Sequence, residues 1–264
     1  FNKLKQTAKQ TLIYSLGNIS SKLIGFVLLP LYTSFLSTQE YGMFAILEVT
    51  ATIMVAVCSF KLSTAMMRWC STEESEYKTK SILFTTYSSA FLIIVLLNAI
   101  LQPFRDSFSL LFFGNSQYQD YFFILFLSVS FEILNLFSLD LIRLKGRSVF
   151  YILVSITRLT TVLVLNIYFI KYLSLGIKGI LLSQLIGNAL ITIITLPVLL
   201  KNMVFNFFYS ELKKMLSYGI PLVFSTISMM LLTMGDRYII KYFLNYSEVG
   251  IYSLGYKIAS VVNV

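Results

Sequence analysis

Long apolar runs constrain this chain more than any other feature of its sequence. A bilayer core needs about 20 apolar residues in a helix. Six complete runs of this kind are present, a seventh follows, and an eighth is under way where the sequence stops. The predicted spans are Thr11–Phe35, Tyr41–Phe60, Ser81–Leu101, Tyr121–Ile142, Val149–Ile170, Gly179–Leu200, Tyr218–Tyr242 and Val249–Val264.

Composition supports membrane-spanning helices over a soluble domain. The chain is 57% hydrophobic and 12% charged, and ordinary soluble domains carry about twice that charge. The runs also lack the two-residue alternation of barrel strands. We therefore expect an all-α integral membrane protein. The run Phe108–Phe113 is too short to span and is expected to be a loop or an interfacial piece.

Missing residue types and motifs narrow the chemistry. The chain has no histidine, and its two cysteines, Cys58 and Cys70, are not in a Cys-x-x-Cys spacing. Histidine-based catalysis and most zinc sites are therefore excluded. Neither a GxxxxGK[ST] loop nor a GxGxxG fingerprint is present. We expect no enzyme activity, no metal and no cofactor.

The net charge of +9 is spread through the loops and does not gather on one polar face. This pattern argues against a nucleic-acid partner. Successive loops lie on opposite sides of the membrane. The loops on one side hold thirteen Lys and Arg residues, and those on the other side hold four. By the positive-inside rule, the N-terminus is expected to be cytoplasmic.

Two segments suggest a division into domains. Residues 201–217 mix Phe, Met and Leu with Lys and Glu, which favours an amphipathic linker on the cytoplasmic membrane surface. The stretch from Phe35 to Phe44 also resembles the stretch from Phe243 to Tyr252, with four identities at an offset of 208 residues. In both, Phe-Leu is followed by Glu-x-Gly and a new helix, which the Glu can cap. An ordinary external turn is the alternative explanation.

A true repeat implies two lobes related by a pseudo-two-fold axis along the membrane normal, with the site between them. We expect a six-helix transmembrane lobe over residues 1–200, the linker over 201–217, and the first two helices of a second, repeat-related lobe over 218–264. The remainder of that lobe is expected to lie beyond the given sequence.

Several short patches carry a family resemblance. They are TLIYSLGNISSKLIG at Thr11–Gly25, Glu40-Tyr41-Gly42, Gly-Asp-Arg-Tyr at Gly235–Tyr238, and Glu248-Val249-Gly250-Ile251-Tyr252. In this order, the chain resembles the polysaccharide biosynthesis family of lipid-linked oligosaccharide flippases. These Wzx-type O-antigen transporters belong to the multidrug/oligosaccharidyl-lipid/polysaccharide (MOP) superfamily.

The resemblance implies a multi-pass protein of the bacterial cytoplasmic membrane with two six-helix lobes around a central cavity. It implies flipping of undecaprenyl-diphosphate-linked oligosaccharide from the cytoplasmic to the outer leaflet, by alternating access. The implied partners are this substrate, membrane lipids, and the polysaccharide polymerase and chain-length machinery.

Ionisable residues inside spans are costly and are candidates for function. Glu132 and Arg158 each lie 13 residues from Lys145, so a hairpin would place them at similar depth and favours an ion pair. If that pair is buried, removing one partner is expected to cost about 3–5 kcal/mol. Asp236 and Lys257 are placed symmetrically about their own loop and are a second candidate pair, whereas Glu48 has no obvious mate.

Lys22 is the cation with the greatest expected functional weight, because it lies mid-span with no depth-matched acid on the next helix. Asn18 shares its helix face. A diphosphate crossing a low-dielectric region needs such fixed cations. The candidate substrate-binding residues are therefore Lys22, Asn18, Arg237, Arg158 and Lys257. The candidate ion-coupling or structural residues are Glu132, Asp236 and Glu48.

Two other functions stay open. A multidrug efflux transporter of the same superfamily predicts an acidic, ion-coupled site, with Glu132 or Asp236 as the coupling residue. A membrane polysaccharide polymerase predicts a large charged external loop, and the longest external loop here, Gln102–Asp120, has only one Arg and two Asp.

Overall fold

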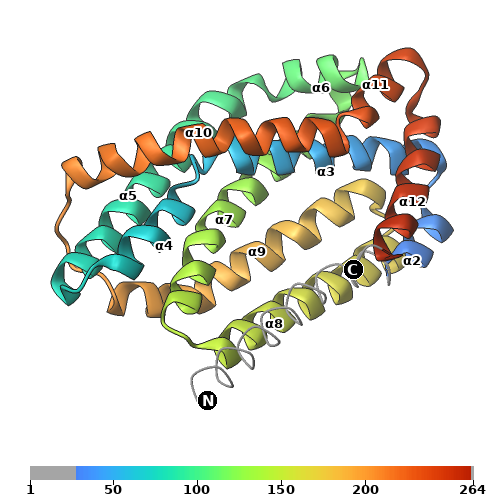
Figure 1. Cartoon of the computed structure of the whole chain (residues 1–264). Helices are drawn as coiled ribbons and strands as arrows, with labels where there is room; N and C mark the ends of the chain where they lie inside the picture. The colour runs from blue at the N-terminus through green and yellow to red at the C-terminus, as the bar shows by residue number, and fades with distance from the viewer. Residues whose placement is uncertain (1–27, 263–264) are drawn as a thin grey trace.

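The computed structural model describes residues 28–262, and within this range every regular element is a helix (Figure 1). The α-helices are α2 (Leu29–Phe35), α3 (Thr38–Cys58), α4 (Leu62–Thr72), α5 (Glu76–Leu101), α6 (Arg105–Phe113), α7 (Gln119–Leu144), α8 (Ser148–Ile167), α9 (Gly176–Lys201), α10 (Tyr209–Met234), α11 (Asp236–Phe243) and α12 (Tyr246–Val262). Short 3-10 turns flank α6, and a π-helical turn, Tyr168–Tyr172, ends α8.

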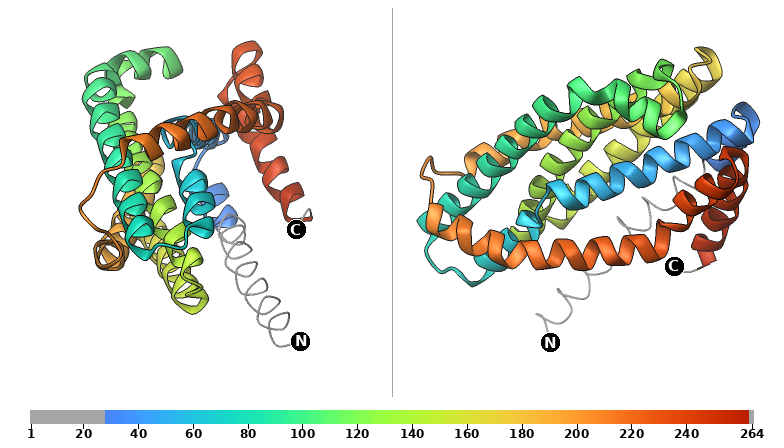
Figure 2. Two further views of the ribbon diagram at one scale, coloured as in Figure 1. Left: turned by 60° about the vertical axis from the view of Figure 1, so that its left-hand side comes forward. Right: turned by 90° about the horizontal axis from the view of Figure 1, so that it is seen from above.

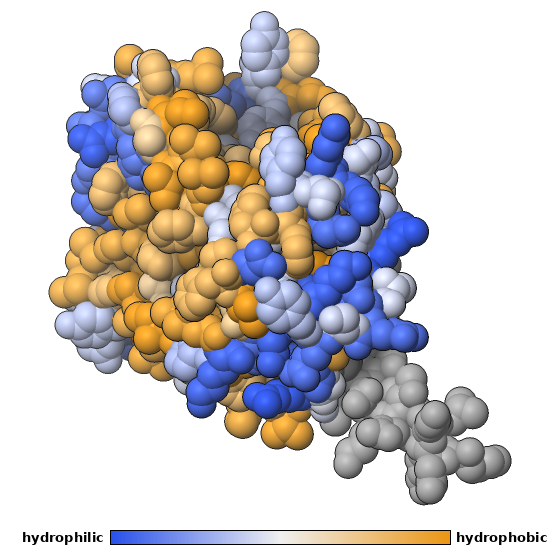
Figure 3. Space-filling view, turned by 90° about the vertical axis from the view of Figure 1, so that its left-hand side faces the viewer, coloured by the Kyte–Doolittle hydropathy of each residue, from blue (hydrophilic) through white to orange (hydrophobic). Residues whose placement is uncertain are grey.

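Six helical stretches in the described residues are long and apolar enough to cross a membrane. They correspond to the second through seventh predicted spans, so the all-α, multi-pass fold is confirmed. The first predicted span lies mostly outside the described residues. The connections after α3, α7 and α9 gather at one end of the bundle, at the left in Figure 1. Hydrophilic residues cluster on part of this end, beside a broad apolar surface (Figure 3).

Helix α7 is the centre of the packing. It contacts α3, α4, α5, α6, α8 and α9, and its Phe122, Phe126 and Ile133 side chains are completely buried. By contrast, α8 and α10 bury few of their side chains completely. Helices α10 and α12 lie on the α3 side of the bundle, away from α8 and α9 (Figure 2).

The two repeated sequence motifs build the same local structure. At the start of α3, the Ser37 hydroxyl accepts a hydrogen bond from the Glu40 amide (3.2 Å). At the start of α12, the Asn245 side-chain oxygen accepts the same bond from the Glu248 amide (3.0 Å). Both are N-caps that satisfy an unpaired amide of the first turn. The Glu40 carboxylate also caps Ser37 (2.8 Å), as the sequence predicted.

The structure corrects two predicted elements. The seventh span, Tyr218–Tyr242, is split: α10 ends at Met234 and α11 begins at Asp236, with Gly235 between them. Glycine has a low helix propensity, so an otherwise continuous apolar run breaks there. For Phe108–Phe113 the alternatives are a loop or an interfacial piece. The structure contradicts the loop, because this run belongs to the helix α6, which follows α5 after the 3-10 turn that contains Pro103.

The segment 201–217 is not one amphipathic piece. Residues after Lys201 run in irregular conformation along α5, where the Val204 amide donates to the Lys80 carbonyl and the Phe208 amide donates to the Thr85 hydroxyl (3.4 and 3.0 Å). From Tyr209 onward the chain is already the first turns of α10. Side-chain and backbone partners on α5 satisfy these amides, which the sequence pattern alone does not show.

Candidate functional site

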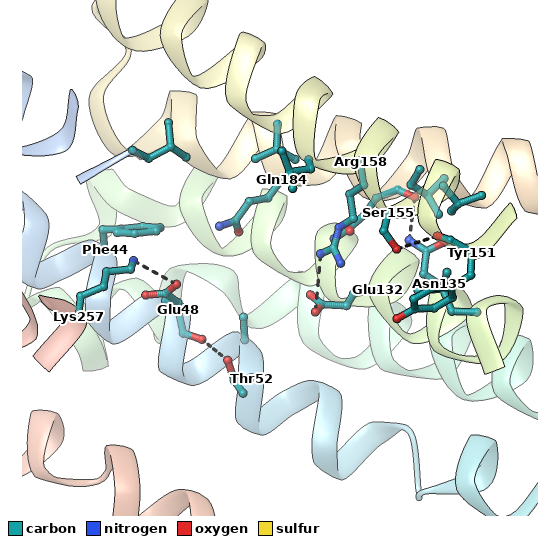
Figure 4. A pocket seen from close by; sticks show the side chains of 18 of the residues that line it. Phe44, Glu48, Thr52, Glu132, Asn135, Tyr151, Ser155, Arg158, Gln184 and Lys257 are labelled. Atoms are coloured by element: carbon teal, nitrogen blue, oxygen red, sulfur yellow. Dashed lines mark hydrogen bonds and ion pairs between the residues drawn. The ribbon is translucent and has the colours of Figure 1, made fainter. Parts of the chain in front are cut away.

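A cavity of about 520 Å³ lies in the middle of the bundle. Helices α3, α7, α8 and α9 form its walls, and α2 and α12 contribute at one end (Figure 4). Its lining is mixed, with apolar residues between charged and neutral polar ones. The polar and charged lining residues are Tyr32, Glu48, Thr52, Glu132, Asn135, Tyr151, Ser155, Arg158, Gln184, Asn188 and Lys257.

The first charged pair lies between α7 and α8. Arg158 approaches Glu132 at 3.9 Å, which is the approach that the hairpin symmetry predicts (Figure 4). The two side chains are 38% and 39% exposed, however, and both line the cavity. The penalty of about 3–5 kcal/mol expected for a buried pair therefore does not apply, because exposed pairs contribute only about 0–1 kcal/mol.

The second charged pair joins α12 to α3. Lys257 lies 3.7 Å from Glu48, and both line the same cavity. The Lys257 ammonium also approaches the rings of Tyr41 and Phe44 at 6.0 and 5.9 Å. The predicted partner of Lys257 was Asp236, and Glu48 was expected to be unmatched. Symmetry about a loop could not reveal this pair, because α12 packs on α3, which is about 200 residues away in sequence.

Asp236 and Arg237 are the first residues of α11, directly after the break at Gly235, and are not among the cavity-lining residues. Arg237 is buried, lies 3.6 Å from the Asp236 carboxylate and donates to the Ser253 hydroxyl (3.2 Å). Its guanidinium also lies 4.7 Å from the Tyr256 ring centre, and Tyr252 donates to Asp236. These contacts hold α11 against α12.

Lys22 and Asn18, the residues expected to carry most of the substrate binding, lie outside the described residues. Of the predicted site residues that the structure describes, it therefore brings together Glu48, Glu132, Arg158 and Lys257. Within residues 28–262, no group of three or more acidic, cysteine or histidine side chains could hold a metal ion.

A buried polar network supports the cavity wall between α7 and α9. The Asn135 amide donates to the Asn188 carbonyl (2.9 Å), and the Thr192 hydroxyl donates to the Asn135 side-chain oxygen (2.9 Å). The Asn188 amide reaches the Ser128 hydroxyl at 3.3 Å. Such networks fix helix positions, because an unpaired polar group in this environment is costly.

Sequence reasoning missed the neutral polar lining. Asn135, Tyr151, Ser155 and Gln184 line the cavity beside the charges (Figure 4). Neutral polar residues inside apolar runs are a weak sign of a site, because they also pack between helices. A test for one shared helix face would have found Tyr151, Ser155 and Arg158, which follow one another at intervals of four and three residues on α8.

The cavity chemistry is balanced rather than simply cationic. Within residues 28–262, two cations and two anions line it, and each of these cations has a carboxylate within 4 Å. Amide, hydroxyl and aromatic groups lie between them. Such a site can hold a ligand with separated anionic and hydroxyl-rich parts, since the weakly held cations can exchange one oxygen partner for another.

Comparison with solved structures identifies the fold. The chain is similar to the MATE multidrug transporter DinF-BH, at 17% identity over 98% of this chain and 61% of that one, with a TM-score of 0.80. It is also similar to a mutant of the Vibrio cholerae MATE transporter VcmN, at 18% identity over 96% and 60% of the chains, with a TM-score of 0.74.

A third similar structure is the inward-facing conformation of a multidrug resistance MATE family transporter of the MOP superfamily. It is 16% identical over 91% of this chain and 58% of that one, with a TM-score of 0.70. The chain thus spans about three fifths of the length of these structures.

Sequence comparison defines the family. A comparison with curated proteins found no match. The family model described as "Polysaccharide biosynthesis protein", however, matches residues 7–264, which is nearly the whole chain. The chain therefore belongs to the polysaccharide biosynthesis protein family, and it has the fold of the MATE transporters.

Proposed function

We propose that the protein flips a lipid-linked oligosaccharide, with the lipid joined to the sugar through diphosphate, from the cytoplasmic to the outer leaflet. The family and the MATE-like fold support transport. The observation that carries the proposal is one membrane-embedded cavity with two partly exposed cations, Arg158 and Lys257.

A diphosphate is the part of such a substrate that most needs help in crossing. An uncompensated anion in a medium of low dielectric constant is strongly disfavoured, and a fixed guanidinium or ammonium offsets that cost. Arg158 can form two parallel hydrogen bonds to phosphate oxygens. Asn135, Gln184 and Ser155 offer donors and acceptors that match sugar hydroxyls. Lys22 and Asn18 complete the proposed binding set.

The wider arrangement follows the same proposal. In this proposal the protein lies in the bacterial cytoplasmic membrane with its N-terminus in the cytoplasm. The connections after α3, α7 and α9 then face the cytoplasm. Residues 1–200 form the first lobe and residues 218–264 begin the second. The matched caps at Ser37 and Asn245 support this repeat. A polymerase and chain-length machinery act on the flipped product.

Multidrug efflux is the second candidate. The two carboxylates in the cavity, Glu48 and Glu132, favour it, because an acidic group can bind a cationic drug or carry a proton. The similar structures named as multidrug transporters point the same way. The two candidates differ in the role of Arg158. In a flippase it binds the substrate, whereas in an efflux pump it only neutralises the charge of Glu132.

The test uses the full-length protein in cells that depend on it for surface polysaccharide. Arg158→Ala should abolish surface polysaccharide and cause lipid-linked precursor to accumulate at normal protein abundance, and Arg158→Lys should restore part of the export. Arg147→Ala, at an exposed loop position beside α8, is the matched control. Full export by Arg158→Ala, with lost resistance to the cationic dye ethidium in Glu132→Gln, would instead establish efflux.

A further inference from the structure

The contact between α3 and α12 joins the two segments that carry the repeat. A methyl group added at Gly42 would overlap the carbonyl oxygen of Tyr246, and one added at Gly250 would overlap the carbonyl oxygen of Thr38. The repeat offset of 208 residues relates Gly42 to Gly250 and Thr38 to Tyr246. The contact is therefore reciprocal, as at a two-fold axis, where residue i meets j and j meets i.

The cavity starts close to this glycine contact, because Phe44, two residues after Gly42 on α3, already lines it. Glu48 lies six residues after Gly42 on α3, and Lys257 lies seven residues after Gly250 on α12. At 1.5 Å per residue both are about 10 Å from the crossing. Their ion pair is a contact between the two helices that also lines the cavity, at the left of Figure 4. The helices cannot separate there unless the pair breaks.

Glu48 is the more exposed residue of the pair. The Glu48 side chain is 48% exposed and lines the cavity, whereas the Lys257 side chain is 22% exposed and lies over the Tyr41 and Phe44 rings. An anionic ligand in the cavity would therefore reach Lys257 by replacing Glu48. Phosphate oxygens are well suited to this exchange, because they offer an ammonium the same type of charge-assisted hydrogen bond.

We propose that the Gly42–Gly250 crossing is a gate that closes one end of the cavity, and that the Glu48–Lys257 pair is its ligand-responsive latch. A phosphate group of the ligand replaces Glu48 as the partner of Lys257, and one of the contacts between α3 and α12 is lost. Binding therefore favours separation of the helices. The latch rests on the proposed function, since it needs an anionic ligand, whereas the gate does not.

The gate is tested without any substrate. In the full-length protein with Cys58 and Cys70 replaced by serine, Thr52→Cys places a thiol in the cavity on α3. A membrane-impermeant thiol reagent is applied to intact cells. Gly250→Ala should raise the labelling rate at position 52 by about fivefold or more, because the added carbon keeps the helices apart and shifts the population to the open state.

Gly255→Ala is the matched control. Gly255 lies on the same helix as Gly250, but a carbon added there meets no neighbouring atom within 4 Å. It should label at the parent rate. Equal labelling of Gly250→Ala and Gly255→Ala, with both proteins at normal abundance, would overturn the gate. If Gly250→Ala is not produced, Gly42→Ala, at the equivalent position of α3, is used in its place.

The latch is tested by the same labelling in membranes with and without inorganic diphosphate as the probe. Diphosphate should speed labelling in the parent and should have no effect in Lys257→Gln. Glu48→Gln should label quickly without diphosphate. Slow labelling of Glu48→Gln would overturn the latch and leave the gate standing. A working gate and latch with no loss of polysaccharide in Arg158→Ala would instead reject only the proposed substrate.

Discussion

The two ion pairs of the cavity look alike but are built from very different parts of the chain. Glu132 and Arg158 lie on neighbouring helices joined by a short turn, whereas Glu48 and Lys257 are 209 residues apart. The first pair holds together one hairpin that already exists. The second pair joins α3 to α12, so it depends on which elements pack together and changes when they separate.

Reversing one charge in the second pair should produce the largest effect. Lys257→Glu places two carboxylates face to face, and like charges at such a contact cost several kcal/mol, so export should fall by about 100-fold or more. The double variant Glu48→Lys with Lys257→Glu restores an ion pair and should recover measurable export. The measurement is surface polysaccharide per unit of membrane protein.

The same swap at the first pair provides the contrast. Glu132→Arg with Arg158→Glu also restores an ion pair, but it restores no contact between α3 and α12 and moves the guanidinium proposed to bind the diphosphate, so export should stay low. If both swaps recover equally, the two pairs have the same role and the comparison fails.

Double-mutant cycles should separate the pairs by a smaller amount. The Glu132–Arg158 pair is about two fifths exposed on both sides, and its coupling energy should be about 0.2–1 kcal/mol. The Glu48–Lys257 pair should couple more strongly, because the ammonium is less exposed and lies over two rings. Thermal unfolding of the purified full-length protein, with Gln and Met substitutions, measures both energies. A larger value for Glu132–Arg158 would contradict this ranking.

The repeated helix caps should have equal and modest effects. Ser37→Ala and Asn245→Ala each remove one side-chain acceptor from a first-turn amide, and each should lower the free energy of unfolding by about 1 kcal/mol. Thr33→Ala, whose hydroxyl only donates within α2, is the control and should change it less. An effect at Ser37 without one at Asn245 would show that the two helix starts are not equivalent.

The orientation of the protein, and with it the side of the membrane on which each pair opens, can be tested by thiol labelling on α4, with the smallest expected change. Burial raises the pKa of the Cys70 thiol to about 12, so this thiol stays protonated between pH 7 and 9. It should resist labelling even in permeabilised cells, in contrast to the reactivity expected of a simple loop. Ser71→Cys is exposed and should label only after permeabilisation. Labelling of Ser71→Cys in intact cells would reverse the proposed orientation.

Local pattern explains why some features were predictable. These features depend on residues that are close in sequence. They are the cap of Ser37 with Glu40, the hydrophobic runs long enough to cross a bilayer, and the Glu132–Arg158 pair at equal distance from its turn. The break at Gly235 and the helical conformation of α6 could not be predicted, because hydropathy measures composition along the chain and is insensitive to where a helix bends or starts again.

Hydropathy and spacing were enough to predict the class of molecule: membrane-spanning helices, short connections and the depth match of Glu132 with Arg158. The contact of Lys257 with Glu48, the burial of Arg237 against α12, and the exposure of Asn135 and Gln184 to a cavity became known from the packing of the helices. The physical reason is that hydropathy and helix period set how far along a span a residue lies. Its partners are decided by packing between helices, which depends on small residues such as Gly42 and Gly250 far apart in the chain.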